Sequence, residues 1–196
     1  MNMMEAKESR ARHWLSYRSE LKVLDCTLRD GGLMNDHTFD DDIVRAIYQA
    51  NVDAGVDYME MGYKADKKIF APTDFGPWKF CDEEDVRHIV GENDTGLKLS
   101  VMADADRTDY HTDILPAEQS VFDMVRVATY IHQVPSAMDI AQDALDKGYE
   151  VTLNLMAVST IQEWELDEAL DIFAESGAQA IYLSDSFGTF YAEQVE

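Results

Sequence analysis

A repeating order of helix, glycine and β-rich strand is the feature that most restricts the fold of this chain. Three amphipathic stretches each end at a glycine and are followed by an apolar run: residues 40–54, 136–147 and 162–176. Gly55, Gly148 and Gly177 stand one step past each helix, where a left-handed backbone is needed and glycine adopts it at little cost. The repeat predicts a parallel sheet covered by helices.

Six apolar, β-rich runs are the expected strands of this sheet. They lie at residues 21–27, 56–62, 97–102, 122–129, 150–156 and 179–184. Their nearly continuous apolar character is typical of strands that are buried on both faces. Less clear helices are expected at residues 82–90 and 113–119. A doubly wound sheet and a barrel both fit, although no GxGxxG motif follows the first strand.

The acidic composition restricts the partners more than the fold. The chain of 196 residues has 39 Asp and Glu against 16 Lys and Arg, a formal net charge of −23. Such a surface repels phosphate backbones and anionic lipids, so neither nucleic acid nor a membrane is an expected partner. Residues 1–20 read as a polar helical extension without a signal-peptide core. Cys26 and Cys81 form no CxxC pair, and a cytoplasmic location is expected.

Polar side chains gather where the predicted strands end, the edge at which α/β proteins place their sites. The most informative of these strand-end segments is LDCTLRDGG at residues 24–32, in which Arg29 and Asp30 precede Gly31 and Gly32. A carboxylate is a hard ligand that suits Mg²⁺ or Mn²⁺, and a fixed guanidinium stabilises an enolate. The glycines would let backbone N–H groups approach a substrate carboxylate. From the spacing alone, a surface Arg–Asp pair before a tight turn is the competing interpretation.

LDCTLRDGG, together with Glu60 in YMEMG and the DSFG at residues 185–188, resembles the DRE-TIM metallolyases. That superfamily includes 3-hydroxy-3-methylglutaryl-CoA lyase, 4-hydroxy-2-oxovalerate aldolase, and the isopropylmalate and homocitrate synthases. The resemblance implies a (β/α)8 TIM barrel over residues 21–196, here incomplete with about six strands. It also implies a lyase of the aldolase type that acts on a small oxo acid through a pyruvate-like enolate, with Mn²⁺ or Mg²⁺ as its cofactor.

The resemblance implies a role for each matching residue. Arg29 would stabilise the enolate, Glu60 would orient that arginine and the substrate, and Asp30 would bind the metal. The positions expected to contact the substrate are Gly31, Asn154, Asp185 and Ser186. Serine rather than threonine at position 186 resembles the residue that the aldolase branch has there.

The sequence departs from the family pattern in ways that leave alternatives open. Leu33 stands where the aldolase branch has an acid/base histidine, and the chain has no His-x-His pair to complete a metal site. The chain is therefore expected to be a fragment of a longer enzyme, whose other metal ligands lie beyond residue 196. A homo-oligomeric state is also expected. An acyl-CoA/2-oxo-acid synthase and an inactive, partner-docking incomplete barrel are the alternatives. Residues 64–81 are expected to form a lid over the ends of the strands, with packing against another subunit as the competing interpretation.

Overall fold

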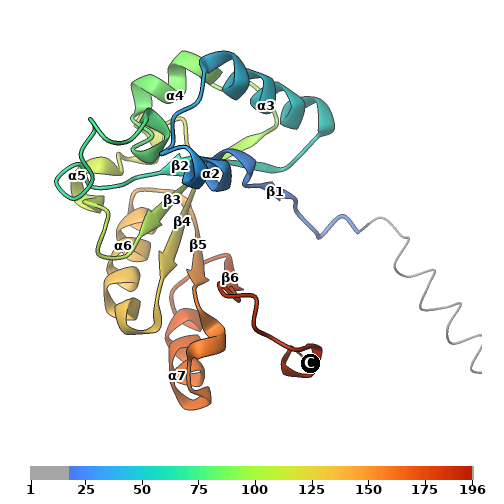
Figure 1. The fold of residues 1–196 in the computed structure, drawn as a ribbon, viewed down its shortest axis with the longest axis vertical. Coiled ribbons are helices and arrows are strands. Elements are labelled where there is room, and N and C mark those ends of the chain that lie inside the picture. The colour runs from blue at the N-terminus through green and yellow to red at the C-terminus, as the bar shows by residue number, and fades with distance from the viewer. Residues whose placement is uncertain (1–17, 196) are drawn as a thin grey trace, which may run out of the picture.

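A computed structural model describes residues 18–195, so most of the helical extension expected at residues 1–20 lies outside the described residues. Within this range, six parallel strands pair in chain order in one sheet. The strands are β1 (Leu24–Asp25), β2 (Tyr58–Tyr63), β3 (Lys98–Asp104), β4 (Met124–Thr129), β5 (Glu150–Leu155) and β6 (Ala180–Leu183). The α/β class and the incomplete barrel are confirmed (Figure 1).

Helices connect the strands, as the repeat predicts. The α-helices are α2 (Thr27–Gly31), α3 (Asp41–Ala54), α4 (Glu83–Val90), α5 (Tyr110–Asp113), α6 (Val134–Asp146) and α7 (Glu163–Ala174). Short 3-10 turns are η1 (Gly32–Met34), η2 (Pro77–Lys79), η3 (Ala117–Gln119), η4 (Ile131–Gln133), η5 (Val158–Thr160) and η6 (Ala192–Gln194). Gly55, Gly148 and Gly177 have φ values of 68°, 95° and 79°, so the three expected glycine stops are confirmed. Among the described residues, no helix is long and apolar enough to cross a bilayer.

The first strand is shorter than expected, and its end is helical. The Asp25 carboxylate accepts hydrogen bonds from the backbone N–H and the hydroxyl of Thr27, at 3.2 and 2.8 Å. Such a local bond competes with the β ladder and favours the start of a helix. Arg29 and Asp30 therefore lie on α2 rather than in a loop. The prediction of a single helix at residues 113–119 was also wrong, because α5 ends at Asp113 and a separate 3-10 turn, η3, begins at Ala117.

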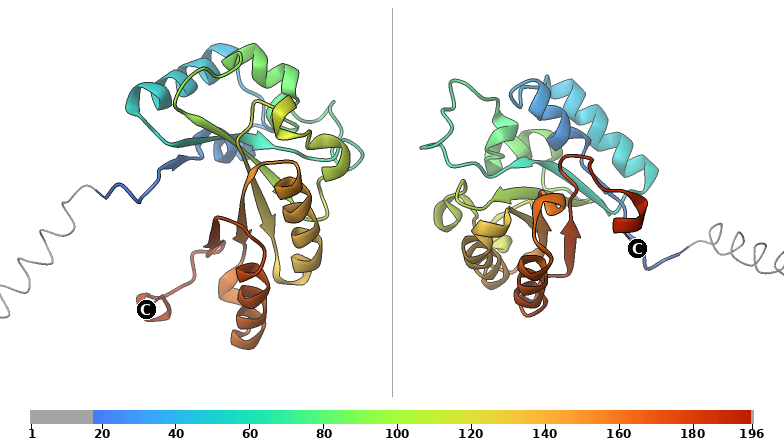
Figure 2. Two further views of the ribbon diagram at one scale, coloured as in Figure 1. Left: turned by 180° about the vertical axis from the view of Figure 1, so that it is seen from behind. Right: turned by 60° about the horizontal axis from the view of Figure 1, so that its bottom comes forward.

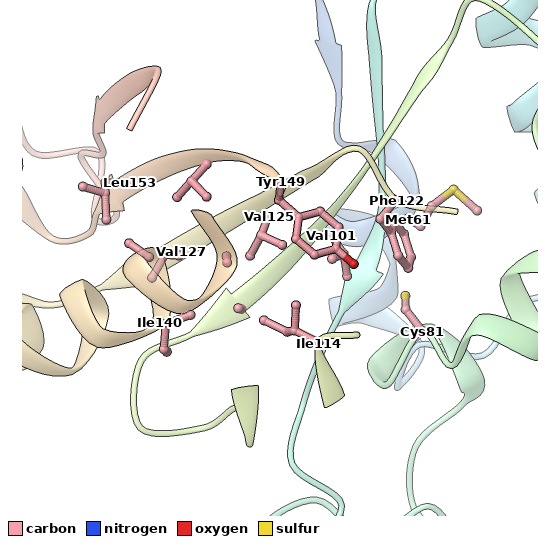
Figure 3. Close-up of a cluster of buried hydrophobic side chains, with 14 of the residues drawn as sticks. Met61, Cys81, Val101, Ile114, Phe122, Val125, Val127, Ile140, Tyr149 and Leu153 are labelled. Atoms are coloured by element: carbon pink, nitrogen blue, oxygen red, sulfur yellow. The ribbon is translucent and has the colours of Figure 1, made fainter. Parts of the chain in front are cut away.

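Helices α3, α4, α6 and α7 pack on one face of the sheet, where they form the main hydrophobic core. Figure 3 shows part of this core, with Val101, Val125, Val127 and Leu153 of the strands and Ile140 of α6. Figure 2 shows these helices from two further sides. The other face of the sheet is less apolar than the strand sequences predict, because buried polar side chains lie on it: Glu60, Ser100, Arg126, Thr152 and Asn154.

An irregularity in β2 brings two important side chains to the same face. Glu60 pairs with Ser100, but Tyr63 pairs with Met102, so the register between β2 and β3 shifts by one residue. Residues three apart in a regular strand face opposite sides of the sheet. The extra residue of this β-bulge therefore turns both Glu60 and Tyr63 towards the polar face.

The segment of residues 64–81 packs closely against the strand that it follows. A Cβ on Gly62 would lie 1.9 Å from the backbone oxygen of Trp78, so the segment passes where a larger residue would not fit. Lys64 Nζ donates to the Cys81 backbone oxygen at 2.7 Å, and the Ala65 N–H donates to Lys79 at 3.2 Å. These contacts fix Lys79 beside the end of β2.

Candidate active site

A cavity of about 240 Å³ lies at the carboxyl ends of β2–β5, the edge where the sequence predicts a site. Its lining includes Arg29 and Asn154, two of the predicted site residues. The remaining lining residues are Leu33, Tyr63, Lys79, Met102, Asp104, Ala105, Arg107, Ala128, Tyr130, Gln133 and Met156. Polar and charged groups from four strand ends thus meet in one space.

Arg29 is held in place by a carboxylate from the neighbouring strand. Its Nε donates to Glu60 Oε2 at 2.7 Å, and its guanidinium lies 5.9 Å from the centre of the Tyr63 ring. Burial alone would lower the pKa of Arg29, but Glu60, Tyr63 and Asp30 together raise it above its ordinary value. A permanently charged guanidinium in a fixed position is the arrangement that stabilises a developing negative charge.

Glu60 is completely buried, at 0% exposure, and is shared between two arginines. Arg126 of β4 donates through Nη1 to both Glu60 oxygens, at 2.8 and 2.9 Å, and its guanidinium lies 4.8 Å from the Tyr182 ring. The same Nη1 lies 3.5 Å from Cys26 Sγ, and burial raises the pKa of that thiol to about 11. Sequence reasoning missed Arg126, although a lone charge within the apolar run FDMVRVAT was a signal that could have found it.

Asp30, the expected metal ligand, lies next to Arg29 but outside the buried pair. Its side chain is 59% exposed, and it accepts a hydrogen bond from Arg29 Nη1. Among residues 18–195, no group of three or more His, Cys, Asp or Glu could hold a metal ion. Hard divalent cations take about six ligands. The groups that the structure describes around Asp30 therefore do not by themselves fit a bound Mg²⁺ or Mn²⁺.

The four predicted substrate-binding residues have different surroundings. Asn154 lines the cavity and accepts a hydrogen bond from Ser184 Oγ at 2.7 Å. Asp185 accepts from the Phe190 backbone N–H at 2.8 Å, and Ser186 Oγ accepts from the Ala157 N–H at 2.8 Å. Gly31 lies in α2, where an added Cβ would have ordinary contact with Phe39 at 3.5 Å. Of these four, Asn154 is the one that the structure brings to the cavity lining.

Gly32 makes room for a side chain of the protein itself. A Cβ at this position would lie 2.2 Å from His37 Nδ1. His37 is buried against the edge of the Tyr63 ring, with ring centres 5.3 Å apart. Burial and the charge of Lys79 lower its pKa to about 4, so the ring is neutral at neutral pH. His37 is also absent from the residues that line the cavity.

Three further ionisable groups line the cavity beside Arg29, and of these sequence reasoning missed Lys79. Burial raises the pKa values of Tyr63 and Asp104, and burial lowers the pKa of Lys79. Arg107 lies close enough to lower the pKa of Asp104. Lys79 comes from the long loop that was expected to be a lid, and it is the residue of this loop that lines the cavity.

Parallel strands in chain order, with a polar cavity at their carboxyl ends, define a half-barrel of the TIM-barrel class. The comparison with family models agrees with the resemblance drawn from LDCTLRDGG. The chain belongs to the HMGL-like family, whose model matches residues 20–196.

Several known proteins are similar to this chain. 4-Hydroxy-2-oxovalerate aldolase 3 of Rhodococcus opacus is 28% identical over 176 residues, which are 90% of this chain and 51% of that protein. An oxaloacetate decarboxylase of Mycobacterium tuberculosis is 28% identical over 175 residues, or 87% of this chain and 49% of that protein. The chain thus spans about half the length of the curated relatives that it matches.

Two solved structures share the fold. The N-terminal domain of a proposed aldolase from Bacteroides vulgatus has a TM-score of 0.73 and 27% identity, over 89% of this chain and 57% of that one. HMG-CoA lyase of Brucella melitensis has a TM-score of 0.60 and 14% identity, over 91% of this chain and 65% of that one. The second likeness concerns the fold alone.

Proposed function

We propose that the protein is a carbon–carbon lyase of the aldolase type, which cleaves a 4-hydroxy-2-oxo acid through a pyruvate-like enolate. The observation that carries this proposal is the position of Arg29, which lines the cavity and is fixed by the buried Glu60. Relatives named 4-hydroxy-2-oxovalerate aldolase support the same reaction class. A cytoplasmic homo-oligomer that acts on a small molecule completes the proposal.

The proposed reaction needs one fixed positive charge and one group that moves a proton. When the bond between C3 and C4 breaks, its electron pair forms the enolate and the negative charge gathers on the C2 oxygen, beside Arg29. The proton of the 4-hydroxyl leaves at the same time, and we assign it to Asp104, a carboxylate of the cavity lining. Burial raises the pKa of Asp104, which suits it to proton exchange. Return of a proton to C3 then yields pyruvate. Asn154 is proposed to position the substrate, and Gly31, Asp185 and Ser186 are proposed to contact it.

Dependence on Mn²⁺ or Mg²⁺ is a separate part of the proposal, with Asp30 as the ligand that this chain supplies. A bound cation would polarise the 2-oxo group as a Lewis acid. Because the described residues do not complete such a site, none of the steps above is assigned to the metal. Removal of divalent cations with EDTA, followed by their return, tests this part alone.

Substitution of Arg29 tests the proposal directly. Arg29→Met should reduce the release of pyruvate from 4-hydroxy-2-oxopentanoate by about 100-fold or more, because the loss of one group that stabilises the oxyanion has that effect. Arg45→Met, which removes an exposed arginine of α3, is the matched control and should retain full activity. Pyruvate is followed with lactate dehydrogenase in the presence of Mn²⁺.

Other results of the same assay would identify the alternatives. Equal activity of the Arg29→Met variant and the unmodified protein would reject the assignment. Release of free thiol that depends on acetyl-CoA and a 2-oxo acid would indicate a synthase instead. A protein that neither turns over nor binds a 2-oxo acid would point to a docking role.

A further inference from the structure

Lys79 is a buried cation without a charged partner. Its side chain lines the cavity, and the residue is 8% exposed. Within residues 18–195, its ammonium has neither a hydrogen bond nor an ion pair within 4.0 Å, although Asp104 is close enough to raise its pKa. A charge removed from water costs free energy unless it finds a partner. Lys79 therefore lacks the group that would normally accompany a buried ammonium.

The aromatic rings around Lys79 stabilise its charge but leave its donors unused. Lys79 Nζ lies 4.5 Å from the ring centre of Tyr63, 4.3 Å from that of Phe70 and 5.7 Å from that of Phe75. Cation–π contacts of this kind are worth about 0.5–2 kcal/mol each. An ammonium also carries three N–H donors, which aromatic rings satisfy poorly. An oxygen acceptor that enters from the cavity would complete its surroundings.

The charge of the cavity is opposite to that of the chain. Three cationic side chains line it, Arg29, Lys79 and Arg107, against one acidic side chain, Asp104. The whole chain has 39 acidic and 16 basic residues, so a random patch of its surface would be negative. Arg29 and Lys79 both lie close to the Tyr63 ring, at 5.9 and 4.5 Å from its centre. Arg29 is paired with Glu60, whereas Arg107 forms no ion pair within 4.0 Å among residues 18–195, although Asp104 is close enough to interact with it.

We propose that Lys79 and Arg107 form an anion subsite beside Arg29, and that the substrate is a 2-oxo acid with a second anionic group, a carboxylate or a phosphate. This inference rests on the proposed function, because Arg29 is taken to hold the reactive end. Lys79 then donates hydrogen bonds to the second anionic group from one side. Arg107, which is exposed at the rim, attracts it from the loop after β3.

Matched ligands test the subsite by direct binding rather than by turnover. 2-Oxoglutarate and 2-oxovalerate have five carbons each and differ in the second carboxylate. Calorimetry on the full chain should show at least 10-fold tighter binding of 2-oxoglutarate. 2-Oxo-4-phosphonobutanoate carries a phosphonate in place of the second carboxylate, so it shows whether the subsite prefers a phosphate or a carboxylate. Tighter binding of this ligand than of 2-oxoglutarate assigns the subsite to phosphate, and weaker binding assigns it to carboxylate.

Two variants and a control test which side chains produce the preference for the dianion. Lys79→Met keeps the length of the side chain and should remove most of the preference for the dianion. Arg107→Gln changes an exposed residue, so it tests the subsite even if Lys79→Met does not fold. Lys67→Met removes an exposed cation of the same loop and should retain the preference.

The outcomes separate this inference from the proposed function. Equal affinity for 2-oxoglutarate and 2-oxovalerate, no binding of either acid, or an unchanged preference in both variants would overturn the subsite. Each of these results can occur while pyruvate release still depends on Arg29, which would leave the lyase assignment intact. Loss of the Arg29 effect with a preserved dianion preference would reject the lyase and retain the anion-binding site.

Discussion

At the scale of single residues, the site depends on one carboxylate between two guanidinium groups. Glu60 is buried and accepts hydrogen bonds from both Arg29 and Arg126. Removal of water from such charges is costly, and their mutual attraction offsets the cost when the geometry is good. Arg126 thus holds Glu60, and Glu60 holds Arg29, so the position of the proposed enolate-stabilising group is set two contacts away from the substrate.

Replacement of Glu60 should therefore be strongly destabilising. Glu60→Gln leaves the buried Arg126 without its counter-charge and Arg29 with the exposed Asp30 alone, so it should lower the free energy of unfolding by about 3–5 kcal/mol. Urea denaturation measures this change. The double variant Glu60→Gln with Arg126→Met should be more stable than Glu60→Gln alone, because one unpaired charge is removed. Glu150→Gln, in a partly exposed pair with Lys98, is the control and should cost about 1 kcal/mol or less.

His37 should make the stability depend on pH. Burial lowers its folded pKa from 6.5 to about 4, so the unfolded chain binds a proton more readily than the fold does. The stability that depends on neutral His37 is present above pH 6.5 and is lost as the pH falls towards 4. Between pH 7 and pH 5 the loss is about 2 kcal/mol.

Comparison with a His37→Asn variant isolates this contribution, because asparagine tolerates the positive φ of 59° at this position. Urea denaturation of both proteins at pH 7 and pH 5 measures it. The variant should lose about 2 kcal/mol less than the unmodified protein over this interval. An identical loss in both proteins would contradict the assignment to His37.

At the scale of elements, β2 and the loop after it build the centre of the site together. The β-bulge turns Glu60 and Tyr63 to one face, and Gly62 beside it allows the backbone of Trp78 to pass closely. The loop then returns Lys79 to the cavity. A change at Gly62 should therefore affect both the packing of the loop and the cavity.

Gly62→Ala tests this close approach. The added Cβ would meet backbone atoms at 1.9 Å, so the loop has to move, and we expect a loss of about 1–3 kcal/mol in the free energy of unfolding. Gly96→Ala is the matched control, because no atom lies within 4 Å of the Cβ built there, and its effect should be within about 0.5 kcal/mol. Thermal denaturation of the two variants gives the comparison. Equal melting temperatures would show that the loop adapts freely.

The elements differ in how well the sequence predicts them. Helices such as α3 could be predicted because their periodicity and their glycine stop are local signals. The early end of β1 could not, because it depends on a side-chain bond from Asp25 to Thr27. Arg29 and Glu60 were found through their motifs. Arg126 and Lys79 were missed, because strand register and the path of a long loop bring them to the site.

At the scale of the whole molecule, acidic charge dominates. The formal net charge is −23, and exposed acidic side chains occur on the helices, as with Asp41 and Asp42 at the start of α3, which are 53% and 99% exposed. Like charges at this density repel each other and favour expanded states. The buried pairs around Glu60 are screened by salt much less than exposed charges are.

Salt should consequently stabilise the fold. Raising NaCl from 0.02 to 0.5 M shortens the screening length from about 20 Å to about 4 Å and should increase the free energy of unfolding by about 1 kcal/mol or more. Urea denaturation at the two salt concentrations checks this expectation. A decrease in stability with salt would mean that exposed ion pairs outweigh the general repulsion.

The pairing of strands in chain order has a consequence for biosynthesis. Each strand needs just the strand made before it, so the sheet can extend while the nascent chain leaves the ribosome. All the residues that line the cavity lie between Arg29 and Met156. The cavity can therefore acquire every one of its walls before α7 and β6 have been translated, and a chain halted at that stage should already have the pocket.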